Sequence, residues 1–252
     1  MPELIIIPVG HFDSDVSVLS PDVPAGQRFR IPVYTYLVKT ANGLILFDTG
    51  CSNQCRTDPA GLLGPDTVPF LTPELAPDDH IQSQLEKLGI RPQDVDLVAN
   101  SHLHFDHAGG NEAFPTNQFG IQRAEWEAAQ TDTDTYPDPA FRPAPEARIT
   151  LFEGDTELAP GVTLLSTPGH TLGHQSLLVE LNDGPVLITS DAVYTRGHFA
   201  VERIGASKNK ELARGSVTRL LQLAQDGAKP FFSHDPDQVD REGWQLAPYR
   251  YR

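Results

Sequence analysis

Short runs of apolar and β-branched residues, separated by glycine, proline and asparagine, predict a chain rich in β-strands. Ile31 to Thr40 alternates and is rich in β-branched and aromatic residues, which is typical of a strand. The following Ala41-Asn42-Gly43 predicts a hairpin turn, after which a second strand ends at Phe47. The predicted strands cover residues 4–7, 31–40, 43–47, 95–100, 118–122, 149–152, 162–166, 175–181, 186–189 and 228–233.

Helical periodicity lies between these strands. Pro77-Asp78-Asp79 predicts the start of a helix whose residues Ile81, Leu85 and Leu88 share one face, and Gly89 ends it. Further helices are predicted at residues 123–130 and 211–226, and long polar or proline-rich loops at residues 10–30, 51–77 and 131–148.

Each half of the chain therefore runs through strands, then a helix, then a strand. This order predicts two β-sheets packed face to face with helices outside, an α/β/β/α sandwich within the α/β class. We expect residues 1–252 to form a single domain, in which the loop at residues 131–148 joins the two halves.

Composition narrows the classes of partner and location. The chain has 252 residues, 39% of them hydrophobic, which is enough for a packed core. A formal net charge of −15 argues against nucleic acid or an anionic membrane as a partner. The apolar run Leu4 to Ile7 is too short for a signal sequence, and Cys51 and Cys55 are expected to be reduced thiols. We therefore expect a cytoplasmic protein.

The densest chemistry lies in Ser-His-Leu-His-Phe-Asp-His, residues 101–107. Four ligand-type side chains occupy six positions there: His102, His104, Asp106 and His107. If the preceding strand continued into this segment, His102 and His104 would point to the same side, while Asp106 and His107 would face elsewhere. Imidazole and carboxylate together suit Zn²⁺ or a similar first-row metal better than Ca²⁺ or Mg²⁺.

Three later strands also end on ligand-type residues, namely His170, Asp191 and His234. Together the seven side chains predict two cations that share one solvent-derived hydroxide. His102, His104 and His170 would hold one cation, Asp106, His107 and His234 the other, and Asp191 would bridge them. Asp48 also follows a strand, where it either faces the same rim or caps the turn at Thr49-Gly50; both interpretations stay open.

The motif His102-Leu-His-Phe-Asp-His107 resembles the signature of the metallo-β-lactamase superfamily, and His170, Asp191 and His234 match its later ligands in order. Further segments resemble the N-acyl homoserine lactone lactonases, the quorum-quenching branch, over most of the chain. These segments are Ile31-Pro-Val-Tyr-Thr-Tyr, Phe47-Asp-Thr-Gly, His107-Ala-Gly-Gly-Asn, Gln122-Arg-Ala-Glu, Thr167-Pro-Gly-His-Thr-Leu-Gly-His-Gln-Ser-Leu-Leu-Val and Asp191-Ala-Val-Tyr194.

This resemblance implies a hydrolase that opens lactone rings by attack of a metal-bridging hydroxide. The two divalent cations would most often be Zn²⁺, with Co, Fe or Mn as alternatives. Tyr194 alone would be interpreted as a core residue, but the resemblance implies that it donates a hydrogen bond to the reacting oxygen. Asp106 could pass a proton to the leaving alkoxide. His174 is expected to support the site without binding metal, whereas His11, His80 and His198 are expected to be surface or loop residues.

The expected partner is a small lactone, and a homodimer is compatible with the sequence. We expect Val18, Leu19, Phe70 and Leu71 to line an apolar pocket at the rim. Alternatives are hydrolysis of another lactone, ester or thioester, as in glyoxalase II, or metal binding without turnover. A nuclease would need a basic groove, and the di-iron redox branch usually carries glutamate in place of His104.

Overall fold

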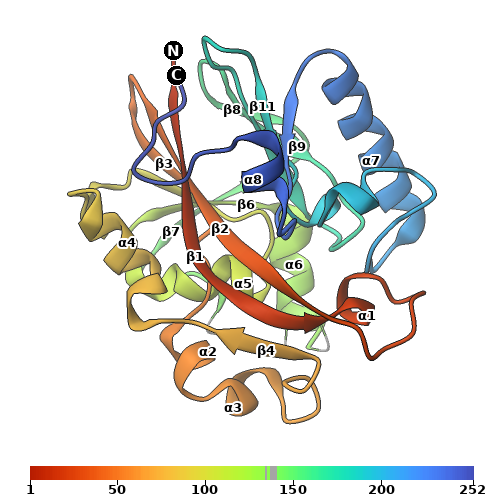
Figure 1. Ribbon diagram of the computed structural model, residues 1–252. Coiled ribbons are helices and arrows are strands. Elements are labelled where there is room, and N and C mark those ends of the chain that lie inside the picture. Colours follow the sequence, from red (N-terminus) through yellow and green to blue (C-terminus); the bar gives the residue numbers. More distant parts are fainter. Residues whose placement is uncertain (134, 137–140) are drawn as a thin grey trace.

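The computed structural model describes all residues except 134 and 137–140. Seven strands form the first sheet, in the order β4-β1-β2-β3-β5-β6-β7, and five form the second, in the order β12-β11-β10-β9-β8 (Figure 1). The first sheet comprises β1 (Glu3–Asp15), β2 (Arg28–Thr40), β3 (Gly43–Phe47), β4 (Leu71–Glu74), β5 (Leu97–Ala99), β6 (Gln118–Gln122) and β7 (Arg148–Phe152). The second comprises β8 (Thr156–Ala159), β9 (Val162–Ser166), β10 (Gln175–Val179), β11 (Val186–Ile188) and β12 (Lys229–Phe231).

Alternation of side chains along the strands builds three apolar layers. Leu4 and Ile6 of β1 join the cluster between the two sheets, whereas Ile5 and Ile7 face the helices outside the first sheet. The helices on that outer side are α2 (Asn53–Thr57), α3 (Pro59–Leu63), α4 (Ile81–Lys87), α5 (Phe105–Ala108) and α6 (Arg123–Thr131).

The second sheet divides its side chains in the same way. Ile188 of β11 faces the first sheet, while its neighbour Leu187 contacts the cluster that contains Val217 and Leu220 of α7 (Lys210–Gln225). Helix, sheet, sheet and helix thus follow one another, and the predicted α/β/β/α sandwich is confirmed. Two further short helices are α1 (Val16–Leu19) and α8 (Gln238–Glu242). Figure 1 shows the termini side by side, where Leu4 pairs with Tyr251.

The two sheets bring the important loops to one edge of the sandwich. Strands β3 and β5 are parallel, so the segments that follow Phe47 and Ala99 leave the first sheet at the same edge. In the second sheet β11 and β12 are parallel, and β9 has the same direction because β10 is antiparallel to both β9 and β11. The segments after Ser166, Ile188 and Phe231 therefore also emerge together.

Several predicted elements are confirmed, including the β2–β3 hairpin and the helices α4, α6 and α7. The predicted loop at residues 10–30 is wrong, because β1 continues to Asp15 and pairs with β2 down to Arg28. Polar residues are tolerated there because their side chains pair across the strands, as Arg28 Nη2 does with Asp13 Oδ2 at 2.8 Å. The predicted loop at residues 51–77 contains α2, α3 and β4, and β8 was not predicted at all.

No helix among the described residues has the length and apolar composition needed to cross a bilayer.

Leu177 on β10 tests the importance of the layer between the sheets. Its side chain is 0% exposed, so Leu177→Ala should lower the free energy of unfolding by about 2–5 kcal/mol through lost burial and a cavity. Urea unfolding of the chelator-treated protein measures this change. Leu212→Ala is the matched control, since Leu212 is 41% exposed and its loss should cost less than about 0.5 kcal/mol. Equal costs for the two variants would contradict this description of the core.

Candidate metal centre

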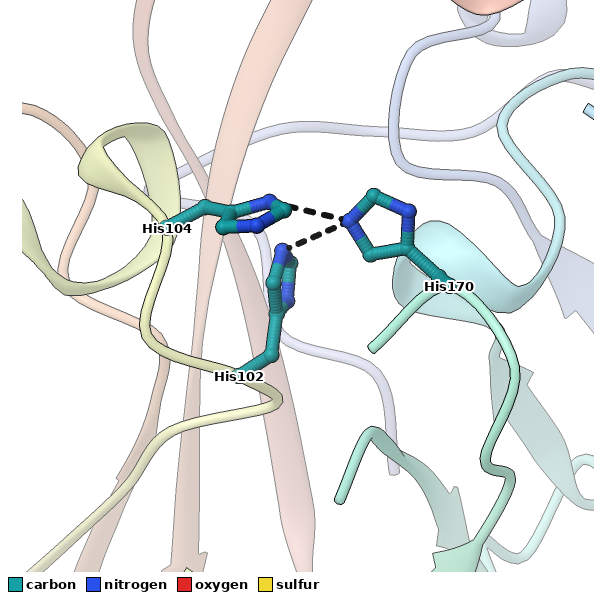
Figure 2. Close-up of side chains that lie close together, drawn as sticks. All are labelled: His102, His104 and His170. Carbon is teal, nitrogen blue, oxygen red and sulfur yellow. Dashed lines mark hydrogen bonds between the residues drawn. The ribbon is translucent and has the colours of Figure 1, made fainter. Parts of the chain in front are cut away.

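His102, His104 and His170 converge on one point at the edge of the sandwich, as Figure 2 shows. His170 Nε2 lies 3.1 Å from His102 Nε2 and 3.0 Å from His104 Nδ1. His102 and His104 do not continue the strand as predicted, because β5 ends at Ala99 and both histidines lie in the turn before α5. The rings converge nonetheless, since His170 approaches them from the second sheet.

A second group contains Asp106, His107 and His234. Asp106 Oδ2 lies 3.5 Å from the Nε2 atoms of both histidines. Asp106 and His107 are in α5, whose short turn directs them away from His104, and His234 follows β12. The structure therefore gathers six of the seven residues predicted from the sequence into two neighbouring groups.

Asp191 lies between the groups, in the 3-10 turn Ser190–Ala192 that follows β11. Its Oδ1 is 3.3 Å from the Nε2 atoms of His107 and His234, both in the second group. Its Oδ2 faces the first group, 3.5 Å from His170 Nε2 and 3.9 Å from His102 Nε2. One carboxylate oxygen thus faces each group, which is the geometry that a bridging ligand requires.

The outward-facing ring nitrogens are held by other groups. Nδ1 of His102 lies 2.9 Å from Ser101 Oγ, and Nδ1 of His107 lies 2.9 Å from Asp48 Oδ2. The Nδ1 atoms of His170 and His234 face the backbone carbonyls of Ala206 and Pro32, at 3.1 and 2.8 Å. A carbonyl or carboxylate acceptor keeps the proton on Nδ1, so the Nε2 lone pair points inward, as in histidines that bind metal.

The surroundings of the two groups shift the pKa values of their histidines in opposite directions. Burial lowers the pKa of His102 and His104 well below the usual value, and neighbouring imidazoles lower it further. These rings are therefore neutral, the form that binds metal. Burial would also lower the pKa of His107, but the carboxylates of Asp191, Asp106 and Asp48 outweigh it and raise the pKa. The carboxylates thus stabilise a positive charge at the second group, either on a protonated histidine or on a bound cation.

Two buried polar atoms at the centre have no hydrogen-bond partner among the described residues: His107 Nε2 and Asp191 Oδ1. A buried polar atom without a partner is costly, at about 1–3 kcal/mol each. A cation between these atoms would satisfy both. The chemistry of the donors and these two orphaned atoms fit divalent metal ions.

The sequence left open whether Asp48 faces the rim with the histidines or caps the turn at Thr49-Gly50. In the structure its carboxylate faces the rim. The residue is 1% exposed and has a φ of 62°, which turns the chain sharply after β3. Its Oδ1 accepts a hydrogen bond from the backbone N–H of Ser101 at 2.6 Å, while Oδ2 contacts His107. Asp48 therefore links β3 to the histidine segment.

Sequence reasoning missed Glu125, a fully buried carboxylate on α6. Burial raises its pKa, and four hydrogen-bond donors oppose that shift. The available signal was its place in the quoted segment Gln122-Arg-Ala-Glu, four residues before the buried Ala129 and so on the same helical face.

The other four histidines do not belong to any cluster of ligand-type side chains among the described residues. His174 Nε2 accepts a hydrogen bond from the backbone N–H of Asp191 at 3.1 Å, so His174 supports the site as expected. His80 and His198 are half-buried and lie in connecting segments. His11 is half-buried in β1, so its assignment to a loop is wrong.

Tyr194 is buried beside the first group. Its hydroxyl lies 2.7 Å from His170 Nδ1 and donates to the carbonyl oxygen of Ala206 at 2.8 Å. Burial raises the pKa of Tyr194 well above its usual value, and the charges of Asp191 and Asp106 add to the shift. The phenol therefore keeps its proton at neutral pH and acts as a hydrogen-bond donor.

Comparisons with known proteins show which family this chain belongs to. The sequence profile described as "Metallo-beta-lactamase superfamily" matches residues 28–247, and the chain belongs to that superfamily. An N-acyl homoserine lactonase of a Bacillus species is 39% identical over 94% of each chain. The N-acyl homoserine lactonase AttM of Azorhizobium caulinodans is 33% identical over 84% of this chain and 85% of its own. Within the superfamily, this chain belongs to the N-acyl homoserine lactonases.

Solved structures extend the likeness to the whole fold. An N-acyl homoserine lactone hydrolase with the product N-hexanoyl-L-homoserine at its catalytic metal centre is 35% identical and has a TM-score of 0.88. The alignment covers 99% of this chain and 98% of that one. A Bacillus thuringiensis AiiA variant bound to N-decanoyl-L-homoserine also has a TM-score of 0.88, at 34% identity over 99% and 98% of the two chains.

Metal content tests the two groups directly. Elemental analysis of metal-replete protein should give two first-row ions per chain. Asp191→Ala should lower both occupancy and activity, because Asp191 is the one described residue whose oxygens face both groups. Asp183→Ala is a suitable control, since Asp183 is exposed and lies in the β10–β11 turn. A single ion per wild-type chain, or full occupancy in Asp191→Ala, would contradict the bridging assignment.

Proposed function

We propose that this protein hydrolyses the lactone ring of N-acyl homoserine lactones with two divalent cations, and that Zn²⁺ is the usual metal, with Co, Fe or Mn as substitutes. The observation that carries the proposal is Asp191, whose two oxygens each face one group of ligand-type residues. Membership in the N-acyl homoserine lactonases supports the substrate class. We also infer that residues 1–252 act as a single domain and, because Cys51 and Cys55 are free thiols, that the protein is cytoplasmic.

The proposed ligands are the seven residues predicted from the sequence. His102, His104 and His170 would hold one ion, and Asp106, His107 and His234 the other, with Asp191 shared. Imidazole nitrogens and carboxylate oxygens are donors that Zn²⁺ accepts readily. The inward nitrogens of His102 and His104 need no protons removed, because burial lowers the pKa of both rings and keeps them neutral.

Two bound cations would supply Lewis acidity and an activated water at neutral pH. The chain itself has to hold the lactone in place and keep competing water away from the reacting carbonyl. It also has to transfer one proton of the attacking water to the leaving alkoxide. Asp106 is suited to the proton, because its side chain is 12% exposed whereas that of Asp191 is 5% exposed. We propose that Asp106 delivers this proton to the alkoxide that leaves when the ring opens.

Tyr194 is proposed to stabilise the reacting oxygen by a hydrogen bond. In this structure the Tyr194 hydroxyl donates its hydrogen bond to the carbonyl oxygen of Ala206. A substrate oxygen placed next to the first group could accept that hydrogen bond instead. The same hydroxyl contacts His170, so Tyr194 could instead act only by orienting that ring. The two roles make different predictions for metal content.

The acyl chain is proposed to occupy a cavity of ≈ 280 Å³ that adjoins His104. Leu62, Leu63, Phe105 and Phe141 line it, so its walls are mainly apolar. None of Val18, Leu19, Phe70 and Leu71 lines this cavity as the described residues define it. Leu19, the last residue of α1, and Leu71, the first residue of β4, are instead buried in the core.

The function is tested by incubating the metal-replete protein with N-acyl homoserine lactones of several chain lengths and following ring opening by mass. Each product should gain the mass of one water. Phenyl acetate and an acyl thioester serve as alternative substrates. Faster turnover of these esters than of every lactone would make the protein a different hydrolase, and no turnover at all would leave a metal-binding protein.

Tyr194→Phe tests the hydroxyl. Removing a lone donor to a developing oxyanion costs about 10²–10³ in rate, and a bound cation would share the charge, so we expect about a tenfold to hundredfold loss in kcat. Both metals should stay bound, because the Ala206 carbonyl still holds His170 Nδ1. Tyr249→Phe is the control, since Tyr249 is 41% exposed. An unchanged rate would make Tyr194 a packing residue, and parallel loss of metal and rate would show that it only orients His170.

Leu63→Trp tests the acyl cavity. The larger ring should narrow the cavity and lower kcat/KM for long-chain lactones about tenfold relative to short-chain ones, without changing metal content. Phe70→Ala provides the comparison, because Phe70 is 44% exposed and does not line the cavity. If Leu63→Trp keeps the wild-type order of chain lengths, the acyl chain binds elsewhere.

A further inference from the structure

Outside the seven proposed ligands, the Glu125 carboxylate contacts both segments that carry the first histidine group. Oε1 accepts a hydrogen bond from the backbone N–H of Leu103 at 2.9 Å, and Leu103 lies between His102 and His104. Oε2 accepts hydrogen bonds from Thr171 Oγ1 at 2.7 Å and from the backbone N–H of Gly173 at 3.2 Å, just after His170. Each oxygen therefore holds one ligand segment.

The two segments need such a link because no regular structure fixes them. His102 and His104 lie between β5 and α5, and His170 lies in the loop between β9 and β10. The loop after His170 presses closely on α6: a Cβ atom at Gly173 would lie 2.1 Å from the backbone nitrogen of Glu125. Tyr136 adds a fourth hydrogen bond, 2.8 Å from its hydroxyl to Oε1. Glu125 is 0% exposed, so water does not compete for these bonds.

We propose that Glu125 is a positioning residue that selectively sets the affinity of the His102, His104 and His170 group for its metal ion. The inference rests on the metal assignment made above. Glu125 does not touch a ligand ring in this structure. It acts through the backbone of Leu103 and through Thr171 and Gly173, and so fixes the separation of the two ligand segments.

Asp48 provides the counterpart at the other group. Its carboxylate contacts the His107 ring directly and the backbone N–H of Ser101, the residue before His102, and it has no hydrogen bond to His104 or His170. Two buried carboxylates on different elements thus support different metal positions, Glu125 from α6 and Asp48 from the end of β3. This division predicts that the two positions can be weakened separately.

Glutamine at position 125 is the most informative substitution because it keeps the size of the side chain. An amide has one oxygen acceptor and one NH₂ donor. Leu103 N–H faces one oxygen of Glu125 and Gly173 N–H faces the other, so either orientation of the amide places NH₂ against a backbone N–H. Glu125→Gln must therefore break the link to one ligand segment. Loss of such a supporting contact typically costs about 10–100-fold in metal affinity.

The experiment titrates the full-length apoprotein with Co²⁺ and follows its visible absorption and heat of binding. His104→Ala and His234→Ala give the absorption spectrum of each position alone. In Glu125→Gln the dissociation constant for Co²⁺ at the first position, the His102, His104 and His170 group, should rise about 10–100-fold. The constant at the second position, the Asp106, His107 and His234 group, should stay within about threefold. Asp48→Asn should show the reverse order. Glu127→Gln, the same change at an exposed position on α6, should alter neither.

Wild-type affinity at the first position in Glu125→Gln, or equal weakening of both positions, would overturn the inference. So would a loss at the first position in Asp48→Asn as large as that in Glu125→Gln. If Glu125→Gln does not fold, Thr171→Val decides, because it removes one hydrogen bond and keeps the carboxylate. It should weaken the first position about threefold to tenfold, and unchanged affinity would overturn the inference. Wild-type protein that binds fewer than two Co²⁺ ions would instead refute the underlying metal assignment.

Discussion

The structure depends on one electrostatic constraint: five imidazoles and two carboxylates meet at a single edge of the sandwich, mostly out of contact with water. Buried ionisable groups are stable only when they are neutralised, paired or bound to metal. Here burial favours neutral His102 and His104, while the acidic residues around His107 and His234 favour positive charge there. Two divalent cations would satisfy both demands, which is why the site fits metal better than protons.

The fold meets this constraint by drawing the site from both sheets. Each sheet contributes loops that leave parallel strands at the same edge, so residues far apart in sequence approach without long excursions. Loops alone would hold such groups loosely. Asp48, Glu125 and His174 accept buried hydrogen bonds that link the ligand-bearing turns to β3, α6 and each other.

The same arrangement places the proposed acyl cavity beside the proposed ligand groups. Four of the five histidines around Asp191 have little freedom, because the outward nitrogens of His102, His107, His170 and His234 are held by other groups. The cavity beside His104 is lined by Leu62, Leu63 and Phe141, which lie outside the central sheets. Phe105 also lines the cavity, and it lies between the proposed ligands His104 and Asp106.

The sequence by itself determined the sandwich and the ligand-type residues, because both are encoded locally. Strand periodicity is readable over a few residues, and His102 to His107 concentrates donors in one segment. Only the tertiary structure decided that Asp48 faces the histidines, that Glu125 joins two ligand segments, and that β1 continues through polar residues to Asp15. Each of these depends on a partner distant along the chain, 59 positions for Asp48 with His107 and 46 for Glu125 with Thr171. A hydrogen bond or strand pair of that kind has no periodic pattern, so it becomes visible only once the two sheets are packed together.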